Sequence, residues 1–473
     1  MSADREHFSS KLGFILAAAG SAVGIGNLVG FPVAAAKNGG GAFLFIYAIF
    51  VIVICLPVMM AEMALGRSTN KDPLGAYTEI SEGDKKWKVA GLIGVITPFM
   101  IGVFYLVITV WIFGYLAGAI TGDLDLLANP NTFGEFITGK SLFGYMVGVV
   151  ALTGFILMSG VKQGIERAAK ILMPTLFMLL VMLVIYVLTL DNAMAGVKFY
   201  ILPDFSKITA SVVSGALSQA FFSLSLGMGI LITYGSYMNR NQDIADSSKL
   251  VALTDTGVAF VAGLMIMPAI FSFDPQIDPS SLSESSISLI FVLIPKIFLS
   301  LQTDIGYFGA SAIASVFFLL VFFAAITSLV SIIEVPNAAL MEQQCISRKK
   351  SLVILGLMVV VLSVFASMSF GMSEFFTKFV WYAGADKSLF DVIYDVFYDT
   401  ILPLNGLLIC LFVSMRWKKH NFNNALKEGA AAGKHSFLFK YSDVALSTVI
   451  PLILFVIFAN TVALKFFGVN LLF

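Results

Sequence analysis

The sequence predicts an all-α polytopic membrane protein of eleven transmembrane helices. Of its 473 residues, 58% are hydrophobic and only 12% are charged, and a soluble domain of this length could not bury so much apolar surface. The charged residues also cluster, which leaves neutral runs as long as the about 20 residues that a spanning helix needs. These runs predict helices at 12–36, 42–65, 89–120, 142–160, 169–190, 209–238, 248–272, 305–341, 351–369, 389–415 and 444–468.

Basic residues gather in alternate segments between these spans, and this asymmetry predicts the orientation. They precede the first span and then separate the second from the third, the fourth from the fifth, and so on to the tenth and eleventh. The opposite segments lean acidic, as at 123–135 and 274–284. Because basic segments stay in the cytoplasm, we expect a cytoplasmic N-terminus and, after an odd number of spans, an external C-terminus.

The first and sixth spans are both interrupted near their centres. The first contains GSAVGIGNLVG (20–30) and the sixth SQAFFSLSLGMGILITYGSYM (218–238), although a glycine costs a helix roughly 1 kcal/mol relative to alanine. Two such breaks five helices apart predict a 5+5 inverted repeat with unwound helices 1 and 6, whose freed backbone groups form a transporter's binding site. Close helix packing through two GxxxG patterns is the alternative for the first span.

A few polar side chains in the spans could join the freed carbonyls as cation ligands. They are Asn27, Ser223, Asp255, Thr327 and Ser328. A carboxylate inside a membrane is costly and therefore points to function, although Asp255 could instead face water at a helix mouth. Thr327 and Ser328 could instead bond to carbonyls of their own helix.

The sequence gives no support for an enzyme. GEFITGKS (134–141) matches the phosphate-binding GxxxxGK[ST] pattern, but it follows a polar loop and lacks the buried strand that this motif requires. Nothing pairs a nucleophile with a histidine, and the zero net charge indicates no nucleic-acid partner. An amino-acid-gated channel or sensor is the remaining alternative to a transporter, and it would need a continuous polar pore.

Several motifs follow one another along most of the chain: REHFSSKLGFILAAAGSAVGIGN, FPVAAAKNGGGAFLFIY, EMALGR, GIERAAKILMP, QAFFSLSLGMG, TYGSYM and AAITS. Together they resemble the neurotransmitter:sodium symporter family, and within it the bacterial eleven-helix amino-acid transporters of the leucine-transporter type. The resemblance implies a multi-pass sodium symporter of the cell inner (plasma) membrane that works by alternating access, with one copy sufficient and a dimer as the alternative. Its repeats would be 1–190 and 191–420, followed by a cytoplasmic linker and the eleventh helix at 421–473.

The resemblance also implies two sodium sites and one substrate site. The first sodium would bind the Ala22 carbonyl, Asn27, Ser223, Asp255 and the substrate carboxylate. The second would bind the carbonyls of Gly20, Val23 and Ala324 and the hydroxyls of Thr327 and Ser328. The substrate's carboxylate and ammonium would meet the Gly24–Gly26 backbone, Tyr105, Ala22, Phe222, Ser223 and Ser225. Its side chain would pack on Ser21, Ile25, Ile101, Phe222, Met228, Ser328 and Ile332.

Three positions set the expected specificity. Family members that carry monoamines have an aspartate where Gly24 stands, so the substrate here should bring its own carboxylate. The apolar wall favours a neutral, hydrophobic amino acid, and the flexible Met228 would admit aromatic side chains. Asp255 stands where chloride-dependent members usually have asparagine, beside Tyr47, Gln219 and Ser223, which match the chloride-site region. A fixed negative charge would replace the anion, so we expect no chloride requirement.

The resemblance implies two gates, of which the outer one departs from the family. On the cytoplasmic side, Arg5 would pair with Glu342 under Tyr237. On the outer side, Gly30 stands where the family has an arginine. The acids of the tenth span, Asp391, Asp395 and Asp399, are therefore expected to lack their partner, and closure would fall to Tyr105 and Phe222.

Overall fold

The predicted helical membrane architecture is confirmed by a computed structural model that describes residues 6–276, 287 and 289–471. Nine helices or continuous helix groups in these ranges are long and apolar enough to span a bilayer. They are α3–η2–α4 (Gly41–Thr69), α6 (Lys85–Thr121), α9 (Ser141–Met158), η3–α10 (Val161–Val187), α14 (Ile244–Phe273), α17 (Gln302–Gln344), α18 (Arg348–Ser367), α20–η7–α21–η8 (Leu389–Trp417) and α24 (Val449–Phe467).

Short helices and one small sheet connect these spans. The helices are α5 (Pro73–Ile80), α7 (Leu124–Leu127), α8 (Thr132–Thr138), α11 (Ala193–Ile201), η4 (Phe205–Lys207), η6 (Leu289–Leu293), α16 (Ile294–Ser300), α19 (Glu374–Thr377), α22 (Lys419–Lys427) and α23 (Ser436–Ser447). The sheet pairs β1 (Val380–Tyr382) with β2 (Ala385–Lys387) in antiparallel register. The described residues predicted for the functional site lie in the spans and their breaks, not in these short helices or the sheet.

The first span is broken where its glycines cluster. It consists of α1 (Lys11–Ala22) and η1–α2 (Gly26–Lys37), two segments bent by 55° relative to each other. Val23 leaves the helix with φ −70° and ψ 93°, so the last carbonyls of α1 lose their helical donors. A straight helix packed through its glycines, the alternative for this span, is not what the structure shows.

The sixth span is broken in the same way. It consists of α12 (Ala210–Ser223) and α13 (Ile230–Ser236), joined by non-helical residues 224–229. Gly227 and Gly229 have φ of 77° and 68°, a left-handed conformation that glycine adopts without steric cost. At Gly227 the fit is also tight, because a Cβ there would lie 2.5 Å from the Leu402 carbonyl oxygen.

The fifth span begins earlier than the predicted residue 169. α9 ends at Met158, Gly160 at φ 85° precedes the π-helical η3 (Val161–Glu166), and η3 leads directly into α10 (Arg167–Val187). The charged residues between 162 and 170, which indicated a loop, lie within this continuous helix. Glu166 is buried and accepts hydrogen bonds from the Ser9 backbone N–H (2.7 Å) and from Lys170 Nζ (2.6 Å).

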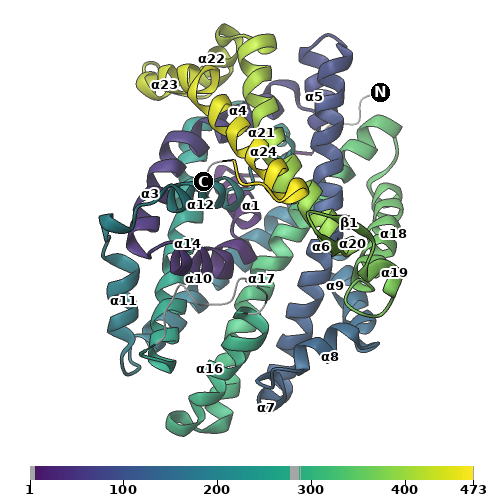
Figure 1. Cartoon of the computed structure of the whole chain (residues 1–473). Helices are drawn as coiled ribbons and strands as arrows, with labels where there is room; N and C mark the ends of the chain where they lie inside the picture. The colour runs from purple at the N-terminus through teal and green to yellow at the C-terminus, as the bar shows by residue number, and fades with distance from the viewer. Residues whose placement is uncertain (1–5, 277–286, 288, 472–473) are drawn as a thin grey trace.

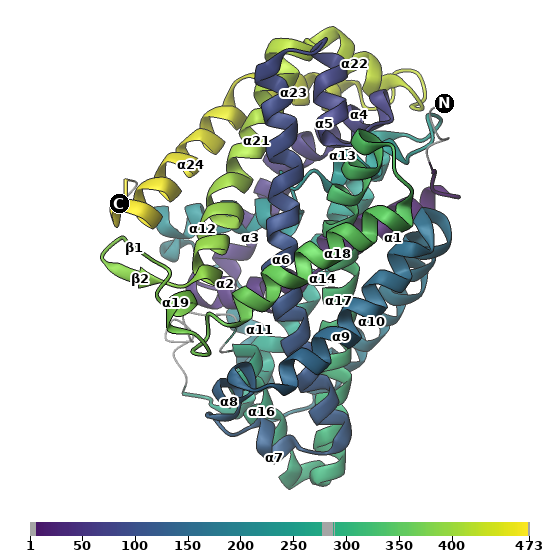
Figure 2. The same cartoon turned by 90° about the vertical axis from the view of Figure 1, so that its right-hand side faces the viewer.

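The broken spans lie inside the bundle, while the last helix lies at its edge. The long helices α6 and α17 pack against each other, and α1 packs against α14, α17 and α10 (Figure 1). Figure 2 shows α24 on the outside of α21 (Leu402–Leu411), with the C-terminus beside β1. The total of eleven spans, the inverted relation of the two halves, their boundaries and the orientation in the membrane stay predictions.

Candidate functional site

Three polar side chains from three separate segments meet where the two breaks face each other. Asn27 Nδ2, on η1 (Gly26–Gly30), donates to Asp255 Oδ1 at 2.7 Å and to Ser223 Oγ at 3.0 Å. Ser223 Oγ, at the end of α12, donates to Asp255 Oδ2 at 2.8 Å. The structure thus brings together the three side chains predicted for the first sodium site.

Asp255 is fully buried on α14, with an exposed fraction of 0%. The alternative of a water-facing residue at a helix mouth is therefore wrong. Among the described residues its side chain has neutral hydrogen-bond donors and no basic partner. Because an uncompensated buried carboxylate is costly, this environment suits a bound cation.

The kink in the first span is held by the same cluster. The Gly24 N–H donates a hydrogen bond to Asn27 Oδ1 at 3.2 Å. A side-chain amide oxygen thus serves as the acceptor for a backbone N–H at the break. The Ser21 carbonyl, close to the break, accepts hydrogen bonds from two other segments. The donors are Ser328 Oγ at 3.0 Å and Ser225 Oγ at 3.4 Å. The Ser21 hydroxyl itself is buried and has no hydrogen-bond partner among the described residues. A polar ligand could satisfy it.

The hydroxyls predicted for the second sodium site lie on α17, next to the end of α1. Thr327 Oγ1 donates to the Phe323 and Ala324 carbonyls of its own helix, at 3.0 and 3.1 Å. The alternative of back-bonding thus holds for Thr327, whereas Ser328 bonds across to α1. A Cβ on Gly20 would lie 3.5 Å from Thr327 Cβ. Thr327 and Ser328 both donate through their hydroxyl hydrogens, and a donating hydroxyl oxygen still has lone pairs that can bind a cation. These hydrogen bonds therefore do not prevent the two oxygens from serving as cation ligands.

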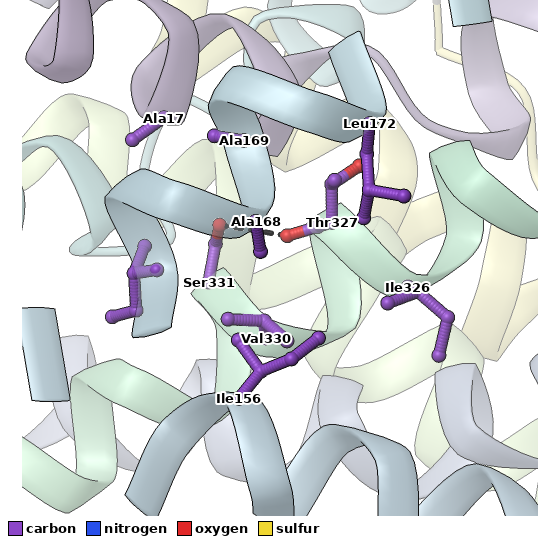
Figure 3. A pocket seen from close by; sticks show the side chains of 10 residues that line it. Ala17, Ile156, Ala168, Ala169, Leu172, Ile326, Thr327, Val330 and Ser331 are labelled. Carbon is purple, nitrogen blue, oxygen red and sulfur yellow. Dashed lines mark hydrogen bonds between the residues drawn. The ribbon is translucent and has the colours of Figure 1, made fainter. Parts of the chain in front are cut away.

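Figure 3 shows a pocket beside this second site, lined by residues of α1, α9, η3, α10 and α17. Thr327 and Ser331 are its polar side chains, and Ser331 Oγ donates to the Thr327 carbonyl at 2.9 Å. The remaining lining is apolar, with Ala17, Ile156 and Leu172 among it. Of the residues expected to contact substrate, none lines this pocket. We therefore do not take it for the substrate site.

The residues expected to contact substrate surround Gly24. A Cβ on Gly24 would lie 2.8 Å from both Ser328 Oγ and Tyr105 OH, and Tyr105 OH accepts from the Ile25 N–H at 3.5 Å. Ile101, Met228 and Ile332 are buried, while Ile25 and Phe222 are half-buried. The structure thus gathers hydroxyls and backbone groups closely around Gly24 at the kink.

Tyr237, which directly follows α13, meets a buried acid. Its hydroxyl donates to Glu334 Oε1 at 2.8 Å, and Glu334 Oε2 lies 2.6 Å from an Arg348 guanidinium nitrogen. Sequence reasoning missed Glu334, although a lone acid in the apolar run 305–341 was a visible signal. Glu342 accepts from the Asp72 N–H at 3.2 Å, and its predicted partner Arg5 lies outside the described residues.

The acids of the tenth span have a basic partner, contrary to expectation. Lys465 Nζ, on α24, lies 2.9 Å from Asp395 Oδ1 and 2.7 Å from Asp399 Oδ2. Asp391 instead belongs to the capping box of α20 (Leu389–Ile393): its Oδ2 accepts from the Ser388 backbone N–H at 3.2 Å, and its own N–H donates to Ser388 Oγ at 3.1 Å. The expectation that Asp395 and Asp399 lack a partner was wrong because it considered only Gly30 and not the distant last helix.

In the region matched to a chloride site, Tyr47 OH is buried without a hydrogen-bond partner among the described residues. Gln219 Nε2 donates to the Gly26 carbonyl at 3.4 Å. The Ser223 hydroxyl already donates its hydrogen to the Asp255 carboxylate, so it is not free to donate to a bound anion.

Comparison with known proteins gives consistent results. The model of the sodium:neurotransmitter symporter family matches residues 5–135 and 138–468. The sodium-dependent transporter YhdH of Bacillus subtilis is 33% identical over 97% of this chain and 98% of its own length. A sodium-dependent transporter of Haemophilus influenzae is 33% identical over 96% and 98%, respectively. The crystal structure of MhsT in complex with L-phenylalanine superposes with a TM-score of 0.80 at 36% identity, covering 96% of this chain and 99% of that one.

Proposed function

The chain belongs to the sodium:neurotransmitter symporter family, and from this premise we propose that it imports neutral, hydrophobic L-amino acids with sodium and without chloride. The family membership makes it a sodium-dependent, multi-pass membrane transporter. The amino-acid class, the chloride independence, the plasma-membrane location with a cytoplasmic N-terminus and the function of a single copy are our proposals.

The buried cluster of Asn27, Ser223 and Asp255 is the observation that carries this proposal. It lies at the meeting point of two broken helices, where freed carbonyls and side-chain oxygens suit sodium. A substrate carboxylate bound beside that sodium would complete the ligand set together with the Ala22 carbonyl. The carbonyls of Gly20, Val23 and Ala324 and the hydroxyls of Thr327 and Ser328 would bind a second sodium.

The chemistry around Gly24 supports a zwitterionic amino acid as substrate. No acidic side chain is present at position 24 to bind an amine, so recognition would use the substrate's own carboxylate at the kink, near Tyr105 OH. The buried Ile101, Met228 and Ile332 offer an apolar lining. That MhsT was crystallised with L-phenylalanine supports an aromatic side chain in the same place.

Uptake of radiolabelled L-phenylalanine into proteoliposomes tests the proposal. We expect accumulation that requires an inward sodium gradient, that stops when an ionophore collapses this gradient, and that proceeds unchanged when gluconate replaces chloride. Uptake that continues after the gradient collapses would exclude symport and favour the channel alternative. A binding screen of the twenty amino acids then identifies the preferred side chain, and binding of only small or charged ones would contradict the proposed pocket.

Met228→Phe is expected to lower the affinity for L-tryptophan relative to that for L-leucine by about tenfold, because pocket contacts of this size discriminate about 10–200-fold. Phenylalanine is stiffer than methionine and cannot repack around a large ring. Competition against bound radioligand measures the ratio of the two affinities. Met228→Leu conserves the side-chain volume and serves as the control. An unchanged ratio in Met228→Phe would show that Met228 does not contact the substrate side chain.

A further inference from the structure

Lys465 is the sole charged residue of α24, which otherwise consists of apolar and small polar residues (VIPLILFVIFANTVALKFF). A lysine at the end of a membrane helix often extends to the lipid interface and interacts with the helix C-terminus. Here the ammonium is directed into the protein, where it contacts two carboxylates at 2.9 and 2.7 Å. The usual role of a lysine at the lipid interface therefore does not explain the position of Lys465.

The two carboxylates need this cation. Asp395 and Asp399 lie four residues apart on η7 (Tyr394–Ile401), and their side chains are only 7% and 15% exposed. Two like charges so close together and so poorly hydrated repel each other. Tyr382 OH, from β1, donates to Asp395 Oδ2 at 2.8 Å, but it is neutral. Removal of Lys465 would leave two uncompensated charges on one helical segment.

The same helical segment contacts the rim of the substrate site. Tyr398, the neighbour of Asp399, stacks on Phe222 with ring centroids 5.0 Å apart and an interplanar angle of 28°. Tyr394 packs on Tyr398 at 4.8 Å. Phe222 immediately precedes Ser223, which bonds Asp255. A continuous series of contacts therefore connects α24 with the break in the sixth span.

We propose that Lys465 is a positioning residue of the outer gate: it neutralises Asp395 and Asp399 and so holds η7 and Tyr398 against Phe222. Helix α24, which lies outside the two breaks (Figure 2), thereby sets how readily the outer side closes over the substrate. The substrate side of this inference rests on the proposed function; the restraint on η7 does not.

The test compares Lys465→Ala with a conservative variant and a matched control. We expect Lys465→Ala to raise the KM for sodium-dependent uptake about tenfold, within the about 5–150-fold range of coupling between distant sites. Lys465→Arg keeps the charge and should stay within about twofold of the wild type. Asp399→Asn in the Lys465→Ala background removes one of the two repelling charges and should recover part of the loss. Lys378→Ala is the control, because in the described part of the chain that exposed lysine pairs with the exposed Glu374 alone.

A second readout does not depend on the substrate. In a Cys345→Ser background, where the remaining Cys55 and Cys410 are buried, Gln219→Cys reports access from outside through its reaction with a membrane-impermeant thiol reagent. Gln219 lies one helical turn before Ser223 and contacts Gly26. Loosening of η7 by Lys465→Ala should increase the labelling rate about fivefold, as expected for a shift toward an open state.

The two readouts separate the two hypotheses. A wild-type protein that takes up no amino acid would overturn the proposed function, while faster labelling in Lys465→Ala would still support the positioning role. Normal sodium-dependent uptake, with KM and labelling both unchanged in Lys465→Ala, would overturn the positioning role alone. A loss of folded protein without a change in KM or labelling would likewise contradict it, since a purely structural ion pair gives that result.

Discussion

Replacing Asp255 with alanine is expected to weaken sodium binding by about 100-fold and thereby to abolish substrate binding at ordinary sodium concentrations. Truncating one member of a buried charged site costs about 2–5 kcal/mol, and Asp255 is the one carboxylate of the cluster with Asn27 and Ser223. The sodium dependence of radioligand binding measures the effect. Asp246→Asn, in the first turn of the same helix but bonded to Lys434, should keep the wild-type sodium dependence.

Asp255→Asn separates charge from shape at the same position. The amide can still meet Ser223 and Asn27, but the fixed negative charge is lost, so transport should become dependent on an added anion. Uptake measured in chloride and in gluconate gives the answer. Equal uptake by Asp255→Asn in both media would contradict the proposal that the Asp255 charge takes the place of chloride.

Gly24→Val is expected to eliminate substrate binding, again by about 100-fold or more. Even the Cβ would lie 2.8 Å from Ser328 Oγ and Tyr105 OH, and the two methyl groups of valine would occupy the position that we propose for the substrate carboxylate. Crowding a closely packed site costs about 1–3 kcal/mol or more in addition to the lost contacts. Equilibrium binding measures the loss, and Gly24→Ala should show a smaller one.

Gly257→Ala is the matched control for this substitution. A Cβ there meets nothing within 4 Å, and the change favours the helix by roughly 1 kcal/mol. It should therefore bind substrate as the wild type does, with equal or greater thermal stability. Wild-type affinity in a folded Gly24→Val protein would show that the substrate does not occupy the space at the kink.

The sequence predicted the helical class and both breaks because hydropathy and glycine content report them locally. Polar residues in apolar runs marked Asn27, Ser223, Asp255, Thr327 and Ser328 as candidate cation ligands. The family resemblance, not the residue pattern, grouped the first three in one sodium site. The boundary of the fifth span was less certain, because Glu166 looks like a loop residue until Ser9 and Lys170 are seen to satisfy it.

Long-range charge pairs were the part that the sequence could not predict. Lys465 lies 66 residues beyond Asp399 along the chain, and no periodicity links them. The same holds for Glu334 and Arg348, whose contact depends on how α17 and α18 pack. Such pairs follow from tertiary packing, which local patterns do not contain.

The Asn27 carboxamide gives the kink a thermodynamic property. Its oxygen accepts the Gly24 N–H at 3.2 Å, and a carbonyl oxygen has a second lone pair to offer. A cation that draws on this oxygen changes the energy of the bend, and a change in the bend alters the affinity for the cation by the same factor. If the proposed sodium binds this oxygen, ion occupancy and the local shape of the first helix are linked, and each should be measured with the other controlled.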